Sequence, residues 1–148
     1  MENIRELCAK LLSNSKENNL MLGRIVLDSL LAVLPNDDKE QRNVSNWLIT
    51  CFCFKVIASD GKISDEEVDY FNKLMNVSFT KDDIYKKIDF FKIEIDDLIK
   101  NISEYKDEIK NNFLTLAILF AASDGEISEK EIKLLDKINS NLGEINGI

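Results

Sequence analysis

The chain has 148 residues, of which 45% are hydrophobic and 31% charged, and its formal net charge is −8. This balance is typical of one folded globular domain, and the excess of acid argues against nucleic-acid binding and against direct adhesion to anionic lipid surfaces. Histidine is absent from the sequence, which excludes Ser-His and Cys-His catalytic pairs and any His-ligated zinc site.

Apolar residues recur at helical spacing, and one proline with five glycines leaves little room for a turn-rich β fold. The pattern first predicts a short amphipathic helix over residues 4–12, which stops in the polar run 13–19. A second helix is predicted over residues 20–34 and ends at Pro35, because the residue before a proline avoids helical backbone angles. Its apolar positions crowd around Leu22, Ile25, Val26, Leu30 and Val33. A turn is expected over residues 36–39.

Two later stretches, residues 47–58 and 113–122, are apolar almost all round, which in a helix indicates a central buried position. Each is far shorter than the ~20 residues that span a bilayer, so we expect core helices and no membrane insertion. Four further amphipathic faces are visible: Val68, Phe71, Leu74 and Met75; Tyr85, Ile88 and Phe91, after a helix start at Thr80; Ile95, Leu98, Ile99 and Ile102; and Ile132, Leu135 and Ile138.

The segment before the second core helix leaves two points open. The helix over residues 95–102 either ends before residue 113 or continues into the core helix with a kink, and a short strand at residues 93–95 is compatible with the β-branched side chains there. Taken together, the sequence predicts an all-α helical bundle of six to eight helices in a single domain, residues 1–148.

An internal repeat is the most informative feature of the chain. Residues 58–68 recur as residues 122–132, 64 positions later, with Ala, Ser, Asp, Gly, Ile, Ser and Glu in register. A repeat of this kind indicates a duplicated supersecondary unit, here a helix-turn-helix corner that follows each core helix. We therefore predict an internal helix-turn-helix pseudo-repeat.

Each repeated residue has a structural explanation. Ser64 with Glu67, and Ser128 with Glu131, fit the capping box, in which the serine accepts from the third amide of the helix and the glutamate accepts from the serine amide. The glycine of each copy suits the left-handed residue after a helix, the aspartate can accept from loop amides, and the isoleucine can pack as a staple. The two motifs are then only helix caps.

The alternative interpretation is a paired acidic site. If the two corners face each other, the carboxylates of Asp60, Glu67, Asp124 and Glu131 crowd together and require a cation, a basic partner or a raised pKa. Oxygen ligands without histidine or cysteine select calcium or magnesium. An EF-hand is excluded because its sixth position requires glycine and its twelfth a bidentate glutamate, where the second motif has Glu129 and Leu135.

Two Ala-Ser-Asp-Gly-x-Ile-Ser-x-x-Glu motifs, each between an apolar and an amphipathic helix, resemble the TerB-like family of tellurite-resistance proteins and co-chaperone domains, over roughly residues 46–138. Residues 1–35 are not accounted for by the motif and form divergent or added helices. The resemblance implies an all-helical bundle with an acidic face that acts in stress-response assemblies near the inner membrane. By position, it implies cation binding at Asp60, Glu67, Asp124 and Glu131.

The leading hypothesis is a non-enzymatic binding module of a bacterial stress-response assembly, which presents an acidic face to Ca²⁺ or Mg²⁺ or to a basic, membrane-associated protein partner. The alternative is a purely structural helical adaptor. An enzyme with paired carboxylates is disfavoured, because the sequence shows no nucleophile, phosphate-binding glycine loop or basic anchor.

The location predicted from the sequence is the cytoplasm, because the first residues are charged and the three cysteines lack CxxC spacing. The cysteines are expected to be free, buried thiols. We expect the protein to reach the inner face of the membrane only through a partner.

Overall fold

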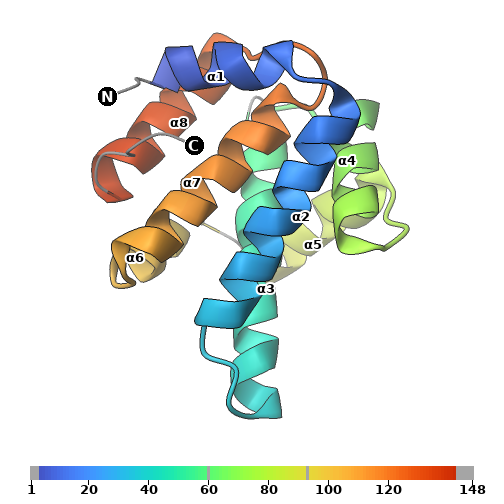
Figure 1. The fold of residues 1–148 in the computed structure, drawn as a ribbon. Coiled ribbons are helices and arrows are strands. Elements are labelled where there is room, and N and C mark those ends of the chain that lie inside the picture. The colour runs from blue at the N-terminus through green and yellow to red at the C-terminus, as the bar shows by residue number, and fades with distance from the viewer. Residues whose placement is uncertain (1–3, 60, 93, 143–148) are drawn as a thin grey trace.

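A computed structural model describes residues 4–59, 61–92 and 94–142, and over these residues the chain forms eight α-helices and no strand (Figure 1). The helices are α1 (Ile4–Ser13), α2 (Lys16–Val33), α3 (Lys39–Ile57), α4 (Asp65–Met75), α5 (Lys81–Phe91), α6 (Ile95–Ser103), α7 (Asp107–Ala122) and α8 (Glu129–Leu142). The all-α prediction is confirmed. That the two halves copy one structural unit stays a prediction, and the strand considered at residues 93–95 includes Ile93, which lies outside the described residues.

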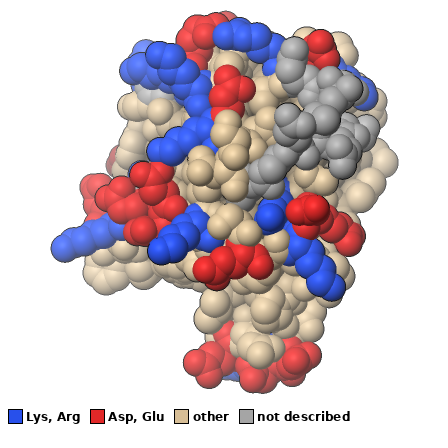
Figure 2. Space-filling model, turned by 90° about the vertical axis from the view of Figure 1, so that its left-hand side faces the viewer, with Lys and Arg blue, Asp and Glu red and all other residues tan. Residues whose placement is uncertain are grey.

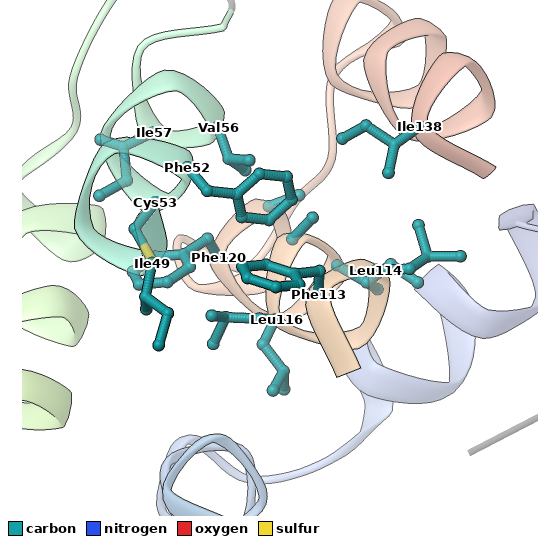
Figure 3. Close-up of a cluster of buried hydrophobic side chains, with 14 of the residues drawn as sticks. Ile49, Phe52, Cys53, Val56, Ile57, Phe113, Leu114, Leu116, Phe120 and Ile138 are labelled. Atoms are coloured by element: carbon teal, nitrogen blue, oxygen red, sulfur yellow. The ribbon is translucent and has the colours of Figure 1, made fainter. Parts of the chain in front are cut away.

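Helix α7 lies at the centre of the molecule. Every residue from Phe113 to Ala122 is buried, and α1, α2, α3, α4, α6 and α8 all pack against this helix (Figure 1). Figure 3 shows the aromatic rings of α3 and α7 meeting in the interior, where Phe52 lies edge-on to Phe113 with 5.1 Å between ring centroids. The prediction that both apolar stretches form core helices is confirmed.

The helix starts differ from the sequence prediction at α2 and α3. Residues 13–19 were expected to be a polar break, but α2 begins at Lys16 because the Ser15 side chain accepts a hydrogen bond from the Asn18 amide at 3.0 Å. Likewise Asp38 caps α3 by accepting from the Gln41 amide at 2.8 Å, so α3 begins at Lys39, well before the apolar stretch. In both places a polar run is the first turn of a capped helix.

Some apolar positions predicted to be buried are exposed. Ile25 and Val33 of α2 are exposed, and the buried face of that helix runs instead through Gly23, Val26 and Leu30. Trp47 is 46% exposed and lies edge-on to Phe91 rather than inside the core. Helix α2 buries a single face, and Ile84 is the one buried residue of α5, so both helices present apolar side chains at the surface.

The helix over residues 95–102 does not continue into the core helix. Helix α6 ends at Ser103 and α7 begins at Asp107, which decides between the two alternatives for this segment in favour of two helices. None of the described helices is long and apolar enough to cross a membrane. Cys8, Cys51 and Cys53 are free and buried, as predicted, and burial raises the pKa of the Cys8 and Cys51 thiols to about 11.

Candidate functional site

The corners that join α3 to α4 and α7 to α8 share a backbone feature at their glycines. Gly61 has a φ of +86° and its amide donates to the Ala58 carbonyl at 3.1 Å; Gly125 has a φ of +89° and its amide donates to the Ala122 carbonyl at 3.1 Å. Such positive φ values favour glycine, because a Cβ is strained there. The left-handed conformation predicted for the two glycines is therefore confirmed, but each glycine lies in the turn after its core helix, and the helices themselves end at the C-caps Ala58 and Ser123.

Both capping boxes are present. The Ser64 amide donates to Glu67 Oε1 at 3.0 Å while the Glu67 amide donates to Ser64 Oγ at 3.1 Å. The same two bonds, at the same distances, join Ser128 and Glu131. Each glutamate thus satisfies a backbone donor at a helix start, and the local structural role predicted for these residues is confirmed.

The burial of the two capping glutamates is unusual. Glu67 is 3% exposed and Glu131 is 4% exposed, although glutamate is among the residue types that are least often fully buried. A capping box does not require such burial, because its two hydrogen bonds form equally well at an exposed helix start. Removing a carboxylate from water disfavours its charged form, so the burial of Glu67 has an electrostatic cost that capping alone does not explain.

The two corners interact electrostatically. Burial raises the pKa of Glu67 to about 7, against the opposing effect of its two hydrogen bonds with Ser64, and the nearby charges of Glu131 and Asp124 raise it further. Burial also raises the pKa of Asp124, and the charges of Glu126 and Glu66 act in the same direction. Residues from the first and second motifs therefore lie near enough to affect one another, which sequence alone could not establish.

The structure brings together only some of the four acids that were predicted to form a cation site. Glu67, Asp124 and Glu131 come from the two motifs and interact electrostatically, and we call these three residues the acidic corner. The half-buried Asp124 also accepts a hydrogen bond from the Glu126 amide at 3.3 Å. Asp60 lies outside the described residues. Over the part of the chain that the structure describes, no three carboxylates or thiols are grouped so that they could hold a metal ion.

The two corners also differ from each other. Beside the first, Asp65 Oδ1 pairs with Lys81 Nζ at 2.8 Å, and the Ile63 amide donates to the Tyr85 hydroxyl at 3.0 Å. Beside the second, Glu129 accepts two hydrogen bonds from Arg5 of α1, at 3.1 and 3.3 Å. Each corner is thus tied by an exposed ion pair to a different neighbouring helix.

The sequence did not predict the cleft that lies beside the acidic corner. It has a volume of about 470 Å³ and is formed by the junction of α1 with α2, the first turns of α4, and the C-terminal end of α7. One of its acids, Glu17, comes from the polar run that was expected to be a break. The signal that could have located this residue is Ser15, a helix cap two positions earlier.

Charge on the face shown in Figure 2 is mixed. Lysine and arginine side chains lie among aspartate and glutamate over most of this face, and acids dominate mainly at its lower end. On this face the net charge of −8 is therefore not gathered into one continuous patch.

The comparison with known families identifies the central and C-terminal part of the chain. The sequence model of the family described as "Tellurite resistance protein TerB" matches residues 47–144. No curated protein and no solved structure matches this chain. The matched range contains both corners and omits α1, α2 and the beginning of α3.

Proposed function

This chain belongs to the tellurite resistance protein TerB family, and we propose that it is a non-enzymatic binding module of a bacterial stress-response assembly, whose acidic corner takes up a divalent cation. The observation that supports this proposal is the pair of almost fully buried glutamates, Glu67 and Glu131, brought into electrostatic contact from two separate corners. A bound cation would offset the part of the cost of burying Glu67 that its hydrogen bonds with Ser64 leave.

The donor atoms favour a hard cation. The acidic corner offers carboxylate oxygens from Glu67, Asp124 and Glu131, and the chain has no histidine. Such oxygen donors suit Ca²⁺ or Mg²⁺, and both ions complete their coordination with water or backbone carbonyls, so a few carboxylates are enough. We further propose that the exposed acids beside this corner, Glu66 and Glu126, receive a basic protein partner, which would hold the module at the inner face of the membrane.

Thermal unfolding during a titration with CaCl₂ or MgCl₂ tests the cation. At about a hundredfold excess over Kd, a cation that binds only the folded state adds about 2.7 kcal/mol to the free energy of unfolding, a rise in Tm of roughly 5–10 °C. The Glu67→Gln plus Glu131→Gln variant keeps an oxygen for each cap and is expected to lose this rise. An unchanged Tm of the unmodified protein at millimolar concentrations of both ions contradicts cation binding.

A structural adaptor is the second candidate, and the complete set of four capping bonds favours it. In that case the repeated residues only hold α4 and α8 at their angles to the core helices. The binding surface would then lie elsewhere on the molecule.

Ser64→Ala isolates the capping role. Because the alanine cannot accept from the Glu67 amide, we expect the free energy of unfolding to fall by about 1 kcal/mol, with the same result for Ser128→Ala. Urea denaturation gives the measurement, and Ser13→Ala, at an exposed serine that caps no helix start, is the control, with an expected change within about 0.5 kcal/mol. If the Ser64→Ala variant also loses the cation-induced rise in Tm, capping and binding are not separable.

A further inference from the structure

The cleft beside the acidic corner has the size and the walls of a small-molecule site. Its volume of about 470 Å³ falls within the range of roughly 300–1,000 Å³ that is usual for ligand pockets. Leu12, Leu20, Tyr70 and Ala122 supply an apolar lining. Tyr70 is fixed there, because its hydroxyl donates to the Asn19 carbonyl at 2.7 Å and its ring packs on Phe120. These two contacts hold Tyr70 in place in the wall of the cleft.

The charged side chains of the cleft favour a cation. Four carboxylates and two ammonium groups line it: Glu17, Asp65, Glu66, Asp69, Lys16 and Lys73. Asp69 pairs with Lys73 at 2.9 Å and Asp65 pairs with Lys81 at 2.8 Å. Glu17 and Glu66 have no ion pair within the described part of the chain, and they come from two different walls, α2 and α4.

The helix ends at the cleft are consistent with this preference. The N-terminal ends of α2 and α4 would by themselves favour an anion, but each is capped by a serine and carries acids in its first turn. The C-terminal end of α7 contributes Ala122, Ser123 and the following turn, where backbone carbonyls favour positive charge. A ligand that fits this cleft therefore carries positive charge together with apolar surface.

We infer that this cleft binds an aliphatic amine, in which positively charged nitrogen pairs with Glu17 and Glu66 while the methylene chain lies against Leu20 and Tyr70. This chemistry is shared by a free polyamine and by a lysine side chain on a protein partner. The inference uses different residues from the proposed cation site. Six of the fourteen lining residues lie within residues 12–20, outside the range that the TerB family model matches, so the site is a property of this chain.

Isothermal titration calorimetry with spermidine, and separately with an acetylated and amidated Gly-Lys-Gly peptide, tests the inference on the whole chain. We expect one molecule of at least one probe to bind per chain. Binding of spermidine alone identifies a free polyamine as the ligand, and binding of the peptide alone identifies a partner's lysine. Failure of both probes to bind overturns the inference.

The chain offers a closely matched control for the site variants. Glu17 and Glu40 are both the second residue of a helix that starts with Lys-Glu, and Glu66 and Glu108 are both the second residue of a helix that starts with Asp-Glu. The variant with Glu17→Gln and Glu66→Gln should bind about tenfold more weakly, because two ion pairs are lost. The variant with Glu40→Gln and Glu108→Gln has the same net charge and should bind within about twofold of the unmodified protein.

Equal weakening in the two double variants would mean that only the overall negative charge attracts the amine, and would overturn the site. The Glu67→Gln variant separates this inference from the proposed function, because it should lose cation binding and retain amine binding. Loss of amine binding in Glu67→Gln would contradict an independent site in the cleft.

Discussion

Replacement of Phe120 by alanine is expected to lower the free energy of unfolding by about 3–5 kcal/mol, the range typical of fully buried phenylalanines. Phe120 is 0% exposed on the central helix α7. Its ring lies edge-on to Tyr70 with 5.2 Å between centroids, and 6.2 Å from the ring of Phe71. Truncation removes apolar burial and leaves a cavity between α7 and α4 that a closely packed core cannot refill. Chemical denaturation monitored by circular dichroism gives the measurement.

The control for this change is Phe90→Ala. Phe90 is 79% exposed and its ring contacts that of Phe91, so its truncation is expected to change the free energy of unfolding by less than about 0.5 kcal/mol. Similar losses in the two variants would show that α7 is not the centre of the core. Because Tyr70 and Phe71 belong to α4, the core contacts of Phe120 also fix the helix that carries Glu66 and Glu67.

The parts of the fold that were predicted from sequence are those with local causes. The apolar stretch of α7 requires burial whatever surrounds it, and the serine and glutamate of each corner specify a cap within four residues. The starts of α2 and α3 were predicted too late, because hydrophobic periodicity does not register a polar first turn. Ser15 and Asp38, the residues that start these helices, act through side-chain caps instead.

The site was less predictable because it depends on long-range packing. Glu67 and Glu131 are 64 positions apart, and their burial depends on how α4 and α8 pack around α7. Their local sequence pattern indicates only a helix cap, and the glutamate of such a cap is most often exposed to solvent. The cleft was missed for the same reason, since Glu17 joins Glu66 only after α2 packs against α4.

Glu67→Gln is expected to stabilise the protein above neutral pH in the absence of divalent cations. The folded state holds the proton of Glu67 with a pKa of about 7, whereas the ordinary pKa of a glutamate is 4.5. Below about pH 4.5 the residue is protonated in both states and costs nothing. Between about pH 4.5 and 7 only the unfolded chain ionises, so folding stability falls as pH rises, and above that range the full cost of about 3 kcal/mol is present.

Glutamine removes this cost at every pH while its carbonyl oxygen can still accept from the Ser64 amide. The free energy of unfolding, measured by urea denaturation with a chelator present, should therefore exceed that of the unmodified protein by up to about 3 kcal/mol above about pH 7. Near pH 4.5 the two should be equal. The control is Glu108→Gln at an exposed helix start, which removes the same charge and should change the free energy of unfolding by less than about 0.5 kcal/mol. A difference between Glu67→Gln and the unmodified protein that is constant with pH contradicts a buried, titrating carboxylate.

The same pair of proteins also connects stability to the proposed function. A saturating divalent cation would stabilise only the protein that retains Glu67, by about 2.7 kcal/mol at a hundredfold excess over Kd. The advantage of Glu67→Gln above neutral pH should then shrink to nearly nothing when CaCl₂ or MgCl₂ replaces the chelator. A variant that remains more stable by the same amount with either ion would show that the buried carboxylate is only a cap, held at an electrostatic cost that no cation offsets.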